Sequence, residues 1–196
     1  MKHAVGIMVL SALLALPTLA QPAPPSAPGM TQPSLFSPSA LRQMDRAQRE
    51  LIRAQYLASL VGDTSLKREA DALLQQAQRE FQGQAYFQAL ERAKTASAIY
   101  EALRFLEVAP RQSFFSGRPG PSRAERRVYT APYRAQEAIA RAEYEASFYN
   151  VRVPLVARLL EEAKGLLAQG GDLARSEAAN HLARATHHLI RAERGF

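Results

Sequence analysis

The hydrophobic positions of this chain follow a helical period from residue 38 onward. Apolar or small side chains recur every three or four residues, which places them in one stripe along a helix. The first such stripe comprises Met44, Ala47, Leu51, Ala54, Ala58 and Val61. No window sustains the period-two alternation that is typical of strands. The pattern therefore predicts an all-α protein.

Turn residues divide the first half of the periodic region into three predicted helices. Ser37 and Pro38 are typical of an N-cap followed by the first helical residue. Gly62 to Thr64 separates this helix from a second over residues 65–82, and Gly83 is expected to supply the left-handed residue that ends it. A third helix is predicted over residues 84–108.

The second half repeats this order. Pro132 is expected to open a fourth helix, which Asn150 closes, and Pro154 to open a fifth. The turn at residues 170–172 then precedes a sixth helix over residues 173–194. The buried stripes are rich in alanine in both halves, which predicts helices that pack at short axial distances.

Residues 46–61 and 134–149 are similar at an offset of 88, reading RAQRELIRAQYLASLV and RAQEAIARAEYEASFY. Self-similarity of this kind indicates a duplicated structural unit. The later helices align at slightly different offsets, and the differences fall in turns, where insertions are tolerated. We therefore expect two tandem three-helix units from an internal duplication, over residues 38–109 and 131–196. They would form an antiparallel helical bundle or a short solenoid.

One stretch resembles tetratricopeptide-like helical repeats. It comprises Leu74, Ala77, Phe81, Gly83, Tyr86, Ala89, Ala93 and Ala96. The unit here has three helices, which departs from that family. The resemblance implies a protein-binding scaffold.

The N-terminal residues 1–20 are typical of a secretory signal peptide. Lys2 precedes an apolar run over residues 4–16, and small residues follow up to Ala20, after which we expect cleavage. The run is short for a membrane span, and an uncleaved N-terminal anchor is the alternative. The protein is therefore expected to be exported, periplasmic or extracellular. Residues 21–37 form a proline-rich linker, either a spacer or a solvated leader.

The amino-acid composition and net charge exclude some kinds of chemistry and favour certain partners. The chain has no cysteine, which excludes disulfides and a lipid-modified cysteine. Its formal net charge of +7 suits anionic lipid headgroups, wall polymers, nucleic acid or acidic proteins. Much of this charge is dispersed in pairs along helices, such as Glu50 with Arg46 and Arg53, as on a solvated helix face.

The first candidate site is the segment over residues 110–130, which joins the two units. Arginine combined with aromatic side chains suits phosphate or carboxylate groups and stacking against rings. A loop of this length is also unusual in a compact domain. The alternative is a plain linker whose phenylalanines pack against the helices. The candidate binding residues are Arg111, Phe114, Phe115, Arg118, Arg123, Arg126, Arg127 and Tyr129.

The second candidate consists of two repeated pairs, Arg53 with Tyr56 and Arg141 with Tyr144. Residues three apart on a helix are neighbours, so each pair forms one spot. The two spots are either equivalent binding sites or core edges, at which each tyrosine covers the core and the arginine stem packs on its ring.

Evidence for catalysis or a cofactor is weak. Glu177, His181 and His188 could offer metal ligands, but their spacing spreads them over about 16 Å along a helix. Only Glu177 and His181 are close, and we interpret these residues and His187 as exposed polar positions. No nucleophile with a base and no phosphate-binding loop is recognisable. We therefore expect a non-enzyme without cofactor or small-molecule substrate.

Two functions remain open from the sequence. The first is an exported scaffold that binds another envelope protein. The second is a binder of an anionic polymer or acidic lipid surface through the arginine-rich segment over residues 110–130. Binding to a polymer should weaken steeply as the salt concentration rises, whereas docking of a protein should not.

Overall fold

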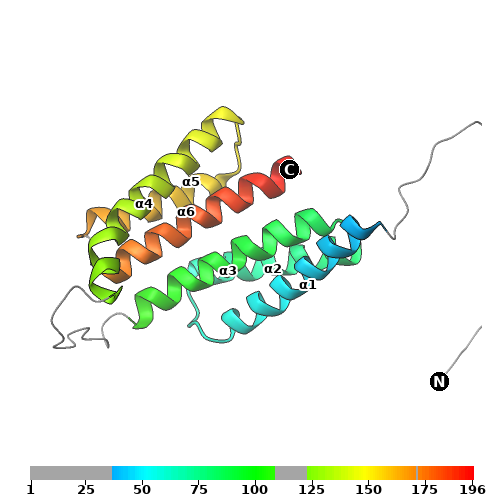
Figure 1. Cartoon of the computed structure of the whole chain (residues 1–196), viewed down its shortest axis with the longest axis horizontal. Coiled ribbons are helices and arrows are strands. Elements are labelled where there is room, and N and C mark those ends of the chain that lie inside the picture. Colours follow the sequence, from blue (N-terminus) through cyan, green and yellow to red (C-terminus); the bar gives the residue numbers. More distant parts are fainter. Residues whose placement is uncertain (1–36, 109–122, 171) are drawn as a thin grey trace, which may run out of the picture. The chain divides into compact units, whose positions relative to one another are not determined.

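The structure is a computed structural model that describes residues 37–108, 123–170 and 172–196. The predicted signal peptide, the proline-rich linker and most of the connecting segment lie outside these residues. Within them the chain forms six helices and no strand (Figure 1). The helices are α1 (Pro38–Ala58), α2 (Ser65–Gln82), α3 (Tyr86–Val108), α4 (Arg123–Phe148), α5 (Pro154–Ala168) and α6 (Leu173–Arg194). The prediction of an all-α protein is confirmed.

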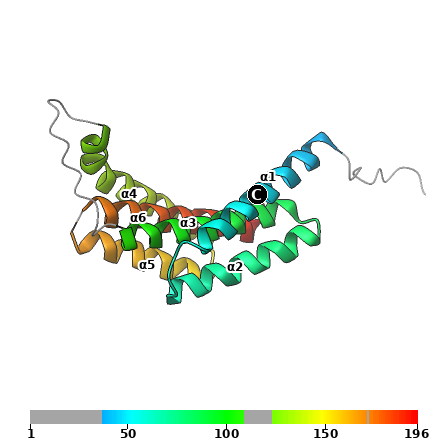
Figure 2. The ribbon, with the colours of Figure 1, turned by 90° about the horizontal axis from the view of Figure 1, so that it is seen from below.

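The third helix of each half lies at the centre of the bundle. α3 and α6 pack along one another, α1 and α2 pack against α3, and α4 and α5 pack against α6. Figure 2 shows α1 and α4 on one side of this central pair and α2 and α5 on the other. The central helices are antiparallel, because Glu101 near the end of α3 meets His181 near the start of α6. The two halves thus use the same packing order.

Small side chains let the central helices approach closely. The predicted alanine stripes are buried, and α3 and α6 are apolar on several sides because each has neighbours on several sides. Larger side chains fill the remaining volume between the helices. The buried residues of this central interface include Ala93, Ala96, Ile99, Ala102, Ala179, Leu182, Ala183, Leu189 and Ile190.

The predicted N-cap at Ser37 is confirmed, and Thr64 and Asp172 also cap their helices. The side chains of Ser37, Thr64 and Asp172 accept hydrogen bonds from the first turns of α1, α2 and α6. The prediction for Gly83 is wrong, because its φ is −78° and the left-handed residue is Gln84, with φ of 63°. The turn closes one residue later than expected, where the Ala85 amide donates to the Glu80 carbonyl over 2.9 Å.

The predicted start of the fourth helix is also wrong. α4 begins at Arg123, and Pro132 lies inside it. The proline ring fixes φ at a helical value, while its missing amide removes the hydrogen bond to the carbonyl of Val128 and its ring crowds that carbonyl, at a cost of about 3 kcal/mol that favours a kink. The helix nevertheless continues through Pro132, and residues 123–130 belong to α4 rather than to a connecting loop.

The strained turn after α2 gives a first testable expectation. Replacing Gln84 with glycine should raise the free energy of unfolding by about 0.5–1 kcal/mol, because a side chain is disfavoured in the left-handed region. Urea unfolding followed by circular dichroism measures the change. Gln75→Gly, an exposed position in the middle of α2, is the matched control and should lower stability by a similar amount. If both substitutions changed the free energy of unfolding equally and in the same direction, the left-handed conformation of Gln84 would be contradicted.

Candidate functional site

Exposed large hydrophobic side chains are unevenly distributed over the described surface. They lie on α1, on α4, or in the residues that follow α1 and α6. The outer faces of α2 and α5 show none among the described residues. Such segregation is typical of a surface that meets a partner. The exposed residues are Leu41, Ile52, Tyr56, Leu60, Tyr129, Tyr133, Tyr144, Phe148 and Phe196.

Four aromatic rings join at the end of α4. Tyr144 stacks on Phe148 with ring centroids 5.8 Å apart, and Phe148 meets Tyr149 edge-on at 4.9 Å. Tyr149 in turn meets Phe196 at 5.1 Å. The guanidinium of Arg194 lies 5.5 Å from the Tyr149 centroid and 5.7 Å from the Phe196 centroid. We call these five residues the aromatic surface.

The end of α6 positions Phe196 in this surface. Gly195 adopts a left-handed φ of 79°, which turns the chain back after the helix. The amide of Gly195 donates to the Arg191 carbonyl, and Arg191 Nε donates to the Phe196 carbonyl over 3.2 Å. The side chains of Tyr144 and Phe148 remain 67% exposed, so the cluster is ordered and still accessible.

The two repeated arginine–tyrosine pairs occupy unlike surroundings. Arg53 binds Glu101 of α3 at 2.5 Å, whereas Arg141 binds Glu145 of its own helix at 3.0 Å. The alternative in which each tyrosine covers the core is wrong, because Tyr56 and Tyr144 are 64% and 67% exposed. Both tyrosines are free to bind a partner, but only Tyr144 belongs to the aromatic surface.

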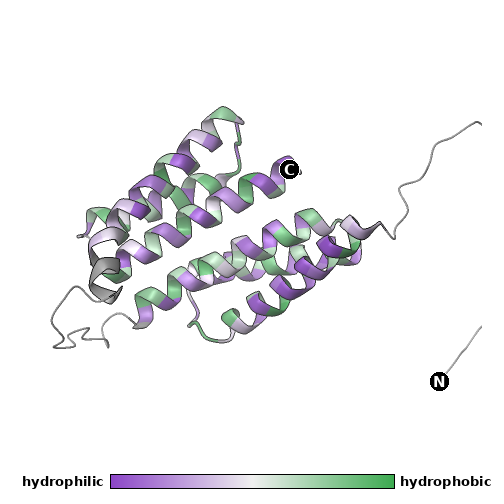
Figure 3. Ribbon diagram, in the orientation of Figure 1, coloured by the Kyte–Doolittle hydropathy of each residue, from purple (hydrophilic) through white to green (hydrophobic). Residues whose placement is uncertain are grey.

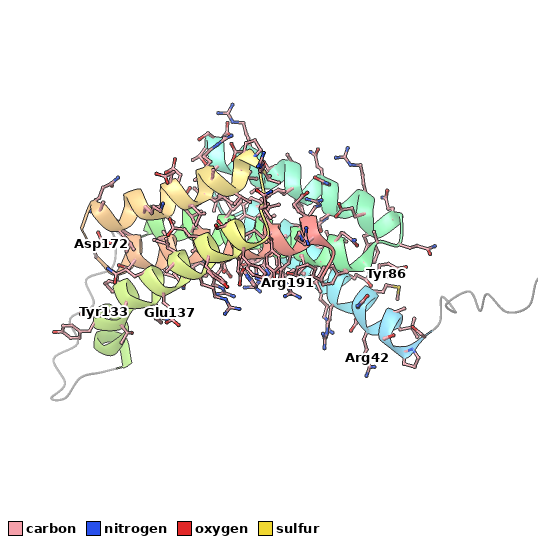
Figure 4. The ribbon with its side chains drawn as sticks, turned by 90° about the horizontal axis from the view of Figure 1, so that it is seen from above. Arg42, Tyr86, Tyr133, Glu137, Asp172 and Arg191 are labelled. Carbon is pink, nitrogen blue, oxygen red and sulfur yellow. The ribbon has the colours of Figure 1, made fainter. Side chains whose placement is uncertain are left out.

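The arginine-rich candidate is only partly described. Arg111, Phe114, Phe115 and Arg118 lie outside the described residues. Arg123, Arg126 and Arg127 lie on the first turns of α4, where only the backbone is described. Tyr129 is 74% exposed one turn before Tyr133, whose side chain points away from α4 in Figure 4. Fifteen residues of helix separate Tyr129 from Tyr144, a rise of about 22 Å.

The predicted histidine cluster forms part of a polar seam between helices. His188 Nδ1 lies 2.8 Å from Glu91 Oε2 on α3, and His181 Nδ1 lies 2.9 Å from Glu101 Oε2. His187 Nδ1 lies 2.5 Å from Glu145 Oε2 on α4. The interpretation of these histidines as exposed is wrong, because antiparallel packing of α6 turns them toward α3 and α4. We call these three pairs the polar seam.

Glu91 is the most buried member of the seam. Its side chain is 1% exposed, and it accepts a second hydrogen bond from Lys94 Nζ at 2.8 Å, with Arg191 Nη1 at 3.7 Å. Burial alone would raise the pKa of Glu91, but the hydrogen bonds from His188 and Lys94 outweigh it and lower the pKa to about 2. Because it contacts His188 and Arg191 of α6, this buried carboxylate links α3 to α6.

The other seam groups are held in the same way. Burial of Glu101 is outweighed by His181 and Arg53, which lower its pKa to about 2. Burial lowers the pKa of His188 below its ordinary value, although Glu91 opposes the shift. Glu177 binds Arg134 of α4 at 2.7 Å, so it is not directed at His181 as a metal ligand. Among the described residues no three metal-binding side chains come together.

Three residues of the aromatic surface and the polar seam were not predicted from the sequence, namely Phe148, Phe196 and Glu91. Phe148 aligns with Leu60 in the repeat and lies one turn after Tyr144, and this spacing could have identified it. Nothing in the pattern places Phe196 beside Tyr149, because that contact depends on how α6 ends against α4. Glu91 resembles any polar position on a helix until its antiparallel neighbour is known.

No protein-family model matches this chain, and neither a curated protein nor a solved structure shows significant similarity to it. The resemblance to tetratricopeptide-like repeats therefore stays a prediction, as does the internal duplication. The helices of the described residues include none with the length and apolar character needed to cross a membrane.

Proposed function

We propose that this protein is an exported, non-enzymatic helical scaffold that binds another envelope protein through the aromatic surface. The observation that carries this proposal is the segregation of exposed large hydrophobic residues onto α1, α4 and the C-terminus. A solvated bundle has no need to expose tyrosine and phenylalanine side by side. Residues 1–20 support export because they have the layout of a signal peptide.

The composition of the aromatic surface suits a protein partner. Tyrosine, phenylalanine and arginine are enriched at protein interfaces and supply much of their binding energy. Tyr144 and Phe148 have few rotatable bonds and stand on a helix, so binding would order them at little entropic cost. Arg194 adds a donor beside the rings for a carbonyl or carboxylate of the partner.

Site-specific photocrosslinking tests this proposal. Tyr144 or Phe148 is replaced by p-benzoylphenylalanine, and the cells that make the protein are irradiated. We expect one discrete crosslinked species in the envelope fraction, because these side chains would lie within the interface. The matched control positions are Gln75 on α2 and Ala157 on α5, which are also exposed but lie on faces without large hydrophobic residues.

Two results would contradict the proposal. The first is the absence of a crosslink from both Tyr144 and Phe148. The second is the same set of crosslinks from Gln75 and Ala157, which would indicate random encounters. The alternative function, binding of an anionic polymer through residues 110–130, stays a prediction that salt dependence tests.

A further inference from the structure

We propose that the outer face of α1 binds an anionic lipid surface. This basic face of α1 consists of four arginines with four exposed apolar residues beside them, namely Arg42, Arg46, Arg49 and Arg53 with Leu41, Ile52, Tyr56 and Leu60. The proposal concerns another helix than the aromatic surface and does not depend on it.

The arginines form one line along the helix. They follow one another at intervals of four, three and four residues, which keeps them on a single side of α1. Arg49 binds Asp45 at 2.5 Å, and Arg53 binds Glu101 and Glu50. Neither Arg42 nor Arg46 has an ion pair or side-chain hydrogen bond with the described residues. Figure 4 shows Arg42 pointing away from the bundle.

The apolar residues distinguish this face from an ordinary solvated helix. Ile52, Tyr56 and Leu60 are 59%, 64% and 41% exposed, although α1 is otherwise mainly hydrophilic in Figure 3. The outer faces of α2 and α5 carry exposed charged residues without such hydrophobic neighbours. α4 is also different, because Thr130 and Glu137 stand where α1 has Arg42 and Arg49.

An anionic bilayer surface can bind both the arginines and the exposed apolar residues of this face. Arginine pairs with lipid phosphates at the headgroup level, while the aliphatic side chains and the tyrosine ring enter the region below. A dissolved polyanion would meet the arginines but offer no apolar region to Ile52 and Leu60.

Binding of this kind should be weak and reversible. Each free arginine near an anionic surface is worth about a fivefold change in partitioning, and paired arginines contribute less. The apolar residues add an anchor comparable to a short acyl chain, which gives only marginal attachment alone.

Vesicle sedimentation of the purified protein tests the proposal at low salt. We expect it to bind vesicles of phosphatidylglycerol mixed with phosphatidylcholine and not vesicles of phosphatidylcholine alone. Arg42→Ala/Arg46→Ala should lower the partition coefficient about 30-fold. The matched control Arg79→Ala/Arg184→Ala removes the same charge from α2 and α6, where both arginines are exposed and have no ion pair with the described residues, and it should change the partition coefficient less than fivefold. All four side chains are exposed, so circular dichroism should show each variant folded.

A third variant separates lipid from polyanion. Ile52→Ser/Leu60→Ser should also weaken vesicle binding, whereas binding to heparin would not need these residues. The proposal is overturned if the mixed vesicles are not bound, or if the control lowers binding as much as the α1 variant. It is equally overturned if Ile52→Ser/Leu60→Ser leaves vesicle binding unchanged. None of these outcomes alters the crosslinks expected from Tyr144, so the two proposals fail independently.

Discussion

Replacement of Glu91 by alanine is expected to lower the free energy of unfolding by about 3 kcal/mol. The carboxylate is 1% exposed and faces Lys94, His188 and Arg191, so its removal leaves Lys94 and His188 without their hydrogen-bond partner and Arg191 without its ion pair. Lys94 and Arg191 are about one-third exposed and can turn toward water, which keeps the cost near the lower end of the range for a broken buried pair. Urea unfolding followed by circular dichroism measures the change.

Two variants define the cause of this loss. Glu91→Gln keeps the volume and one acceptor, and it should be intermediate because only the charge is lost. Glu161→Ala removes a glutamate that is 74% exposed and paired with Lys164, and it should change stability by less than about 0.5 kcal/mol. Loss of stability in Glu91→Ala no greater than in Glu161→Ala would show that the seam does not hold α3 against α6.

The local pattern was sufficient to predict most of the fold. Periodicity identified the six helices of the described residues, and the N-cap at Ser37 could be predicted because it depends on residues within one turn. The failures were also local. The left-handed conformation was predicted for Gly83 but is adopted by Gln84. Pro132 was predicted to begin a helix but lies inside α4.

The site was harder to predict because it depends on which helices meet. From the sequence, His181, His187 and His188 were predicted to be exposed. Only the packing of α6 against α3 and α4 shows their carboxylate partners. The repeat predicted that Tyr56 and Tyr144 belong to equivalent sites, and this stays a prediction. It could not show that both rings face solvent, since a tyrosine at the edge of a stripe can turn either way.

The polar seam should also make the protein sensitive to acid, with three groups acting in the same direction. Glu91 and Glu101 have pKa values of about 2 in the fold, below the ordinary 4.5 of glutamate. As the pH falls, the unfolded chain takes up these protons first. The stability that they contribute is therefore present above about pH 4.5 and is lost as the pH falls toward 2. The pKa of His188 is lowered below 6.5 by burial, so its loss begins earlier, below about pH 6.5.

We therefore expect the free energy of unfolding to fall by about 3 kcal/mol between neutral pH and about pH 3.5 from the two glutamates alone. Lys94, His188 and Arg191 surround Glu91, and Arg53 and His181 surround Glu101. Urea unfolding at a series of pH values measures the loss. Glu91→Gln/Glu101→Gln is less stable at neutral pH but has no carboxylates to take up these protons, so its stability should depend much less on pH. Equal pH dependence in the variant and the parent would place the acid sensitivity outside the seam.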